Sequence, residues 1–200
     1  VVESIRVITR PASERIVKYA FDLARIKGRR KVTFCHKADV MRMSDGLFLK
    51  CAQEVADDFP FIQFEQKPID NVCLELVLDP TKFDVLVMEN LFGDVISDLC
   101  AGLVGGLGVV PGANLGTRYA VFEAVHGSAP DIAGKGLANP IACLRSGAMM
   151  LEHVGYREPA LRIESAVRKT LQNAKGLTRD LGGDGNTETI TRELIANLAS

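Results

Sequence analysis

The sequence has no tryptophan, few aromatic residues and no excess of either charge. Phe, Trp and Tyr make up 6% of its 200 residues, and 24 Lys and Arg stand against 25 Asp and Glu. This balance argues against a nucleic-acid-binding face or an acidic tail. No apolar run reaches the roughly 18 residues without charge that a membrane span requires. We therefore expect neither nucleic acid nor a membrane as a partner.

The sequence also lacks the pattern of a disulfide framework. It holds five cysteines, an odd number, and none of them forms a CxxC pair. Scattered cysteines in apolar contexts are typical of free thiols in a reducing compartment. The chain begins with Val1 rather than Met, which we interpret as the interior of a longer protein.

What the sequence does contain is 47% apolar residues, arranged in alternating strand-like and helix-like segments. This order predicts an α/β protein with a largely parallel sheet. The predicted strands are 2–9, 31–36, 61–66 and 83–89, and the predicted helices are 11–28 with Ser13 as N-cap, 43–59, 70–80 and 93–106.

From residue 105 the amino-acid composition changes. Residues 105–117 are rich in Gly and Pro, which predicts a loop at a domain boundary or hinge. A strand at 119–124 follows, with no expected partner inside this chain. A polar loop and three helices, near 139–154, 158–174 and 187–198, complete the prediction.

Two aspartates, Asp94 and Asp98, stand four residues apart in a predicted helix, so both carboxylates lie on one face. Spacing alone leaves two readings equally open. Both side chains can be solvated, paired with bases or, for Asp94, used to cap the helix. Alternatively, a divalent cation bridges them, and oxygen ligands favour Mg²⁺ or Mn²⁺. Asp70 precedes another helix and is either a third ligand or, more simply, an N-cap.

Two further segments carry chemistry. Lys37 follows the carboxyl end of a predicted strand, and open α/β sheets bind ligands outside these ends. Lys37 is therefore either a proton carrier or an ordinary surface lysine. The glycine-rich loop 126–134 contains a single acid, Asp131. A carboxylate there accepts hydrogen bonds from ribose hydroxyls and repels a 2′-phosphate, which favours NAD over NADP. The loop does not match the GxGxxG fingerprint.

Four segments, in this order, resemble the metal-dependent β-hydroxyacid oxidative decarboxylases, the isocitrate and isopropylmalate dehydrogenases. They are HKADVMRMSDGLF, NLFGDVISDLCAGLVGGLG, VFEAVHGSAPDIAGKGLANP and DLGG. The resemblance covers essentially the whole chain and implies a fold of two α/β domains whose N-terminal part is missing here. Residues 1–105 would be the small domain, with the dimer contacts, the metal site and the catalytic lysine. Residues 106–200 would be the C-terminal part of the large, cofactor-binding domain.

The resemblance also implies roles for individual residues. Lys37 matches the catalytic lysine, which assists proton removal, and Asp70, Asp94 and Asp98 match the ligands of Mg²⁺ or Mn²⁺. In this family the equivalents of Lys37 and Asp70 reach into the neighbouring subunit, so an active site implies a dimer. Three parts of the chain match residues that bind NAD. Glu123 matches a residue near the nicotinamide, and Asn139 matches a residue that holds the adenine. The loop that binds the adenosine is matched by His126, Gly127, Ser128, Ala129, Pro130, Asp131 and Ile132.

The implied function is oxidative decarboxylation of isocitrate to 2-oxoglutarate with NAD⁺, by a catalytic-type subunit of the tricarboxylic acid cycle. We expect a homo- or hetero-oligomer of related subunits in the mitochondrial matrix, or in the cytoplasm of a prokaryote. The alternatives are a 3-isopropylmalate dehydrogenase and a non-catalytic regulatory subunit. The first quoted segment favours isocitrate, and the intact GDVISD and HGSAPDIAG segments favour a catalytic subunit. Asp39 and Glu89 depart from the family pattern. The tyrosine and arginines that contact substrate lie outside these residues, so we expect the fragment alone to be inactive.

Overall fold

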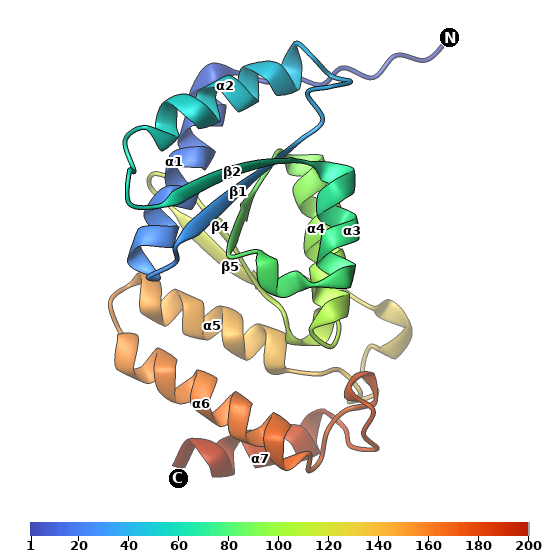
Figure 1. Ribbon diagram of the computed structural model, residues 1–200. Helices are drawn as coiled ribbons and strands as arrows, with labels where there is room; N and C mark the ends of the chain where they lie inside the picture. The colour runs from blue at the N-terminus through green and yellow to red at the C-terminus, as the bar shows by residue number, and fades with distance from the viewer. Residues whose placement is uncertain (200) are drawn as a thin grey trace. The chain divides into compact units, whose positions relative to one another are not determined.

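The computed structural model describes residues 1–199 and divides into two compact units (Figure 1). The first unit comprises Val1–Ser97, and the second begins at Asp98. Helix α4, Asn90–Leu103, runs across the division. Each unit has its own hydrophobic core. No helix among residues 1–199 combines the length and the apolar character needed to cross a membrane.

The first unit is built on a three-stranded sheet. Strands β1 (Lys31–His36), β2 (Gln63–Pro68) and β3 (Val85–Val87) lie in the order β2-β1-β3, and both pairings are parallel. Figure 1 shows α1 (Arg10–Ile26) and α2 (Ser44–Ala56) on one side of the sheet and α3 (Ile69–Leu78) with α4 on the other. A short helix, η1 (Pro80–Lys82), leads into β3. The predicted parallel α/β arrangement is confirmed.

Strand β1 is central and buried, because it has a neighbour on each edge and helices on both faces. Its Phe34 is fully buried and meets Phe48 of α2 edge-on, with ring centroids 4.7 Å apart. Phe21 of α1 is also fully buried and stacks on Phe59 at 5.0 Å. Such aromatic contacts add about 0.5–1.5 kcal/mol each beyond burial. The first contact packs α2 against the sheet, and the second packs α1 against the turn that follows α2.

The prediction of a strand over residues 2–9 is wrong. In the structure this segment has no regular hydrogen-bonded partner, and Val2, Ile5 and Val7 are exposed. The alternation of apolar residues was present, but an isolated strand leaves its backbone groups unpaired. The N-cap of α1 is Thr9 rather than Ser13, since the Thr9 hydroxyl accepts a hydrogen bond from the Ala12 amide.

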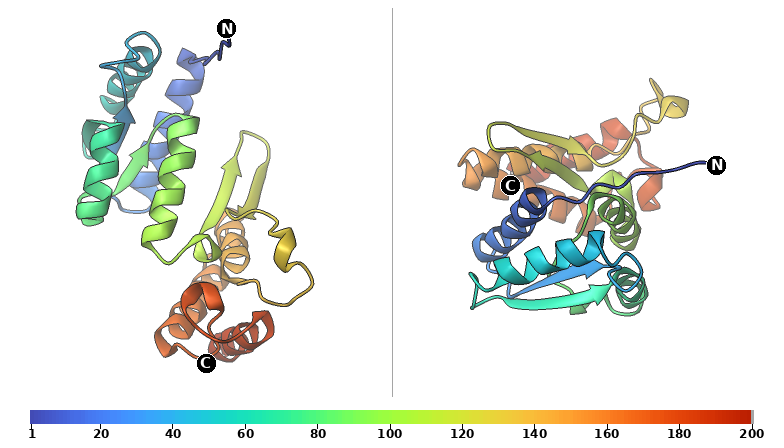
Figure 2. Two further views of the ribbon diagram at one scale, coloured as in Figure 1. Left: turned by 90° about the vertical axis from the view of Figure 1, so that its right-hand side faces the viewer. Right: turned by 90° about the horizontal axis from the view of Figure 1, so that it is seen from above.

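The second unit consists of a hairpin and three helices. Strands β4 (Pro111–Leu115) and β5 (Ala120–Ala124) pair antiparallel, and Figure 2 shows this hairpin beside α5 (Ile141–His153). Helices α6 (Arg157–Asn173) and α7 (Thr187–Ala199) follow, with α5 on α6 and α6 on α7. The short helices are η2 (Leu107–Val109), η3 (Pro130–Ile132) and η4 (Arg179–Leu181). The core residues are Val109, Ile141, Val167, Ile190 and Leu194.

The hairpin corrects the prediction that 119–124 has no partner in this chain. Residues 111–115, which the Gly and Pro content placed in a loop, form the neighbouring strand. Gly112 lies opposite Glu123, where an added Cβ would approach the Glu123 carbonyl oxygen to 3.1 Å. Glycine in a strand often marks such a close backbone approach, and here it was misread as a loop signal.

Candidate functional site

The first unit places three sequence-predicted segments at one edge of its sheet. His36 at the end of β1 lies in register with Pro68 at the end of β2, so Lys37 and the start of α3 leave the sheet together. Strand β3 ends at Val87, and α4 begins three residues later. Parallel strands have their carboxyl ends on the same side, and this side is where open α/β sheets bind ligands. Topology therefore gathers Lys37, Asp70 and the first turn of α4.

Lys37 is held by acidic side chains. Its Nζ lies 2.8 Å from Asp70 Oδ1 and 3.4 Å from Asp39 Oδ2. The hydrogen bond to Asp70 raises the pKa of Lys37 above its ordinary value, and the same bond lowers the pKa of Asp70. Both shifts stabilise the charged forms. The N-cap of α3 is Pro68, so the simpler reading of Asp70 as a cap is wrong.

An ion pair between a partly exposed arginine and a buried carboxylate lies next to Lys37. The Asp45 side chain is almost fully buried; its Oδ2 accepts a hydrogen bond from the Lys37 backbone amide at 2.7 Å, and its Oδ1 pairs with Arg6. Arg6 also lies 3.8 Å from Glu89 Oε1 and over the Phe92 ring. Arg6 thus connects the end of β1 with the beginning of α4. Sequence reasoning missed Arg6, because it is separated from Asp45 by 39 residues.

Glu89 caps helix α4. Its carboxylate oxygens accept hydrogen bonds from the backbone amides of Leu91 at 3.0 Å and Phe92 at 3.2 Å. The reading of Asp94 as the cap is therefore wrong, and Glu89, noted as a departure from the family pattern, has a local structural role. A carboxylate at a helix N-terminus satisfies unpaired amides and interacts favourably with the helix dipole.

Asp94 and Asp98 lie one turn apart on α4, and both are exposed. Neither side chain has a basic partner among residues 1–199, so the reading of two aspartates paired with bases is not supported. No three His, Cys, Asp or Glu side chains of this same range lie close enough together to hold a metal ion. Two free carboxylates on one face fit Mg²⁺ or Mn²⁺ in their chemistry, but the remaining ligands must come from elsewhere.

The predicted cofactor loop lies in the second unit, directly after β5. Residues 126–131 are exposed, and Asp131 lies in η3 with no basic partner among residues 1–199. Ala129 has a left-handed backbone, with φ of 42°, which turns the chain into η3. The Glu123 carboxylate accepts a hydrogen bond from the Asn114 side-chain Nδ2 across the hairpin at 2.9 Å.

The far end of this loop is anchored to the first turn of α7. The Thr187 amide donates to the Gly136 carbonyl at 2.8 Å, and the Thr187 hydroxyl donates to the Ala138 carbonyl at 2.5 Å. Asn139, the predicted adenine residue, is buried and accepts a hydrogen bond from the Ile141 amide at 3.0 Å. It donates to Asp180 in η4 at 2.9 Å. A cavity of about 670 Å³ borders Gly134, Lys135 and α7.

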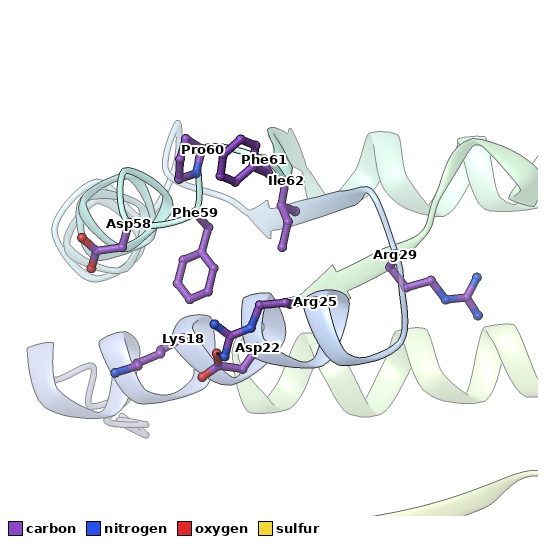
Figure 3. A pocket seen from close by; sticks show the side chains of 9 residues that line it. All are labelled: Lys18, Asp22, Arg25, Arg29, Asp58, Phe59, Pro60, Phe61 and Ile62. Carbon is purple, nitrogen blue, oxygen red and sulfur yellow. Dashed lines mark hydrogen bonds and ion pairs between the residues drawn. The ribbon is translucent and has the colours of Figure 1, made fainter.

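Another cavity, about 940 Å³, lies elsewhere in the first unit. Figure 3 shows Lys18, Asp22 and Arg25 of α1 below the turn 58–62, which leads into β2. This is the amino end of the parallel strands, opposite the edge where Lys37 lies. Two of its cations are paired with acids, Arg25 with Asp22 at 2.7 Å and Arg29 with Asp84 at 3.2 Å. Its position at the amino end of the strands argues against this cavity as the catalytic site.

Comparison with known proteins decides the family. The family model for isocitrate/isopropylmalate dehydrogenase matches residues 1–197. The chain belongs to this family. Its fold is that of the isocitrate/isopropylmalate dehydrogenases: the crystal structure of isocitrate dehydrogenase from Methylococcus capsulatus superposes with a TM-score of 0.96 at 50% identity, over 99% of this chain and 59% of that one.

Two relatives show how far the family resemblance reaches. A probable mitochondrial isocitrate dehydrogenase [NAD] subunit alpha of Drosophila melanogaster is 54% identical over 198 residues, 99% of this chain and 52% of the relative. A 3-isopropylmalate dehydrogenase of Archaeoglobus fulgidus is also 54% identical over 198 residues, 99% of this chain and 60% of the relative. The chain spans about half the length of the curated relatives it matches. These identities show membership of this family of dehydrogenases and leave the substrate open.

Proposed function

We propose that the whole protein oxidatively decarboxylates isocitrate to 2-oxoglutarate with NAD⁺ and Mg²⁺ or Mn²⁺, as a catalytic-type subunit of the tricarboxylic acid cycle. The observation that carries the proposal is the pair Asp94 and Asp98, one turn apart on α4, exposed and without a basic partner among residues 1–199. An uncompensated pair of carboxylates costs stability, so a cation that they bind is a sufficient reason for their presence.

The residues of this chain have distinct parts in the proposal. Asp94, Asp98 and Asp70 would hold the cation, which as a Lewis acid polarises substrate oxygens and lowers the pKa of the hydroxyl. Asp131 and the loop 126–132 would bind the adenosine half of NAD⁺. Lys37 would move the proton of the substrate hydroxyl. In the present geometry, its pairing with Asp70 and Asp39 favours the protonated form. Loss of its bonds to Asp70 and Asp39 would lower the pKa of Lys37 and make it a better base.

The proposal includes a dimer with shared sites. Relatives named as subunits support an oligomer, and Asp70 does not join Asp94 and Asp98 within the described chain. In addition, Leu74, Val77 and Leu78 are exposed at helical spacing on α3, and Leu91 and Val95 are exposed on α4. Clusters of exposed apolar residues on a helix face are typical of an interface. A partner of the same family would cover these residues and bring Asp70 to the neighbouring pair.

We also propose the domain roles and the location that go with this function. Residues 1–105 would form the small domain with the dimer contacts, the metal ligands and Lys37, and residues 106–200 the C-terminal part of the cofactor-binding domain. Mitochondrial relatives support the mitochondrial matrix as the location, while the archaeal relative at the same identity supports the cytoplasm for a prokaryotic source.

The second candidate is 3-isopropylmalate oxidation, because the Archaeoglobus relative is as similar as the Drosophila one. The test is NADH formation by the full-length protein with isocitrate or 3-isopropylmalate in parallel wells, with Mn²⁺ or with EDTA. We expect Mn²⁺-dependent turnover of isocitrate at least a hundredfold more efficient than that of isopropylmalate, a discrimination of about 2.7 kcal/mol. The reverse preference would establish the second candidate, and no turnover with either substrate would favour a regulatory subunit.

A further inference from the structure

The side chain of Asn139 is bonded at both ends within the second unit. Its Oδ1 accepts a hydrogen bond from the amide of Ile141, the first residue of α5, at 3.0 Å. Its Nδ2 donates to Asp180 Oδ2 at 2.9 Å. Asn139 is 8% exposed, so water competes little with its bond to the Ile141 amide, whereas Asp180 is exposed and its bond to Asn139 is only partly buried. The orientation of the Asn139 side chain is therefore determined by these two partners, one from the next turn of chain and one from 41 residues away.

Asp180 is itself held in place by a tight turn. It lies in η4, between the buried Thr178 and Gly182, which has a φ of 77°. The Gly183 amide donates to the Thr178 carbonyl at 3.1 Å. A Cβ on Gly183 would lie 2.1 Å from the Leu177 carbonyl oxygen, so only glycine allows the turn to close. The turn thus presents the Asp180 carboxylate at a defined position.

Gly108, from a third segment of the chain, lies beside the hydrogen bond between Asn139 and Asp180. A Cβ built on Gly108 would lie 2.5 Å from Asp180 Oδ2 and 3.2 Å from Asn139 Nδ2, the two atoms that share the hydrogen bond. The backbone of Gly108 is not in the left-handed region, so alanine is compatible with its conformation. An alanine methyl would therefore act on the Asp180 carboxylate rather than on the backbone.

We propose that Asp180 is a positioning residue for cofactor binding that acts through Asn139. Gly108 leaves room for the Asp180 carboxylate, because it has no side chain. The inference rests on the proposed function, in which Asn139 holds the adenine of NAD⁺. Asp180 fixes the Asn139 side chain, and through it the end of the loop 126–138 that precedes Asn139. Loss of this bond would leave the catalytic groups unchanged and would weaken binding of the adenine end of the cofactor.

The first experiment is steady-state kinetics of the full-length enzyme with Asp180→Ala, Asp180→Asn and Asp184→Ala. Loss of one charge-assisted hydrogen bond predicts about a tenfold higher KM for NAD⁺ in Asp180→Ala, with kcat and the KM for isocitrate within twofold of wild type. An asparagine oxygen still accepts the Asn139 N–H, so Asp180→Asn should restore most of the affinity. Asp184→Ala removes the same charge from the same turn, at an exposed position with no hydrogen-bond or ion-pair partner among residues 1–199, and should behave as wild type.

Gly108→Ala breaks the same contact by a different route. It should reproduce the KM increase of Asp180→Ala, and the double variant should be no worse than either single variant, since both remove one interaction. Additive effects would overturn the shared mechanism. Thermal unfolding of each variant, measured without cofactor, distinguishes a specific loss of NAD⁺ binding from a general loss of stability. A general loss of stability would lower kcat and raise both KM values together.

An analogue tests whether the effect is transmitted to the base. Nicotinamide hypoxanthine dinucleotide differs from NAD⁺ only at the adenine edge. We expect wild type to prefer NAD⁺ and Asp180→Ala to lose most of that preference. An active wild type with an unaltered KM for NAD⁺ in Asp180→Ala would overturn this inference alone. A wild type that reduces no NAD⁺ with either substrate would overturn the proposed function.

Discussion

Replacing Asp98 with asparagine in the full-length protein tests whether Asp94 and Asp98 bind a cation. The expected effect on the stability of the folded protein has one sign without the cation and the opposite sign with it. Asp94 and Asp98 are exposed, one turn apart and without a basic partner among residues 1–199. Like charges at this spacing destabilise a helix by about 0.2–0.5 kcal/mol. Without metal, Asp98→Asn should therefore unfold at the same temperature as wild type or slightly higher.

With Mn²⁺ the order should reverse. A ligand at a hundred times its Kd stabilises the folded protein by about 2.7 kcal/mol, whereas a site with one carboxylate fewer gains much less at the same concentration. The repulsion that the substitution removes is several times smaller than this gain. The net expectation is a variant about 2 kcal/mol less stable than wild type in saturating Mn²⁺, and without metal-dependent turnover.

The assay is thermal unfolding of the full-length protein over a MnCl₂ titration from EDTA to millimolar concentration. Asp58→Asn is the matched control, because it removes an exposed carboxylate from the turn between α2 and β2. This control should follow the wild-type curve. Equal stabilisation of wild type and Asp98→Asn, with the same Mn²⁺ midpoint, would refute the reasoning, and so would full activity of Asp98→Asn.

Three further predictions use other parts of the molecule. Asp131→Lys should raise the ratio of kcat/KM for NADP⁺ over NAD⁺ by tenfold or more, about 1.4 kcal/mol, since a cation there attracts the 2′-phosphate; an unchanged ratio contradicts the loop assignment. Arg6→Met leaves the buried Asp45 carboxylate without its ion-pair partner, and urea unfolding should show a loss of about 3–5 kcal/mol; a loss under about 1 kcal/mol means that the Asp45 carboxylate is not buried in solution. Asp84 accepts a hydrogen bond from the Arg30 amide, which lowers the pKa of Asp84, so its stabilising effect is present above the unfolded pKa of about 3.9 and disappears as the pH falls through the lower folded value. The stability difference between wild type and Asp84→Asn should accordingly be constant from about pH 5 to 7 and shrink below about pH 4.

Several structural expectations held because they depend on local pattern. The buried strand 31–36 and the helices near 11–28, 70–80 and 158–174 have the apolar spacing of their elements, and the structure contains each of them, with shifts of a few residues at the ends. The family motifs also lie within short segments, and the family match over residues 1–197 confirmed the resemblance. The pair Asp94 and Asp98 could be placed on one helical face from spacing alone.

Other features depend on contacts between segments far apart in the chain. The alternation at 2–9 resembled a strand, but a strand requires a neighbour, and none lies beside it in the described chain. Conversely, residues 111–115 lack the sequence pattern of a strand, but they form one because residues 120–124 pair with them. Local composition cannot report whether a hydrogen-bonding partner is present.

The sequence by itself determined the identity of the reactive groups and the order of the elements that carry them. The tertiary structure alone decided which of those groups meet: Lys37 with Asp70 at neighbouring strand ends, Arg6 with the buried Asp45, and Asp180 with Asn139. The physical reason is that charge, acidity and helical spacing are properties of a residue and its near neighbours in the chain. Burial and hydrogen bonding between distant residues exist only after the sheet and helices have packed.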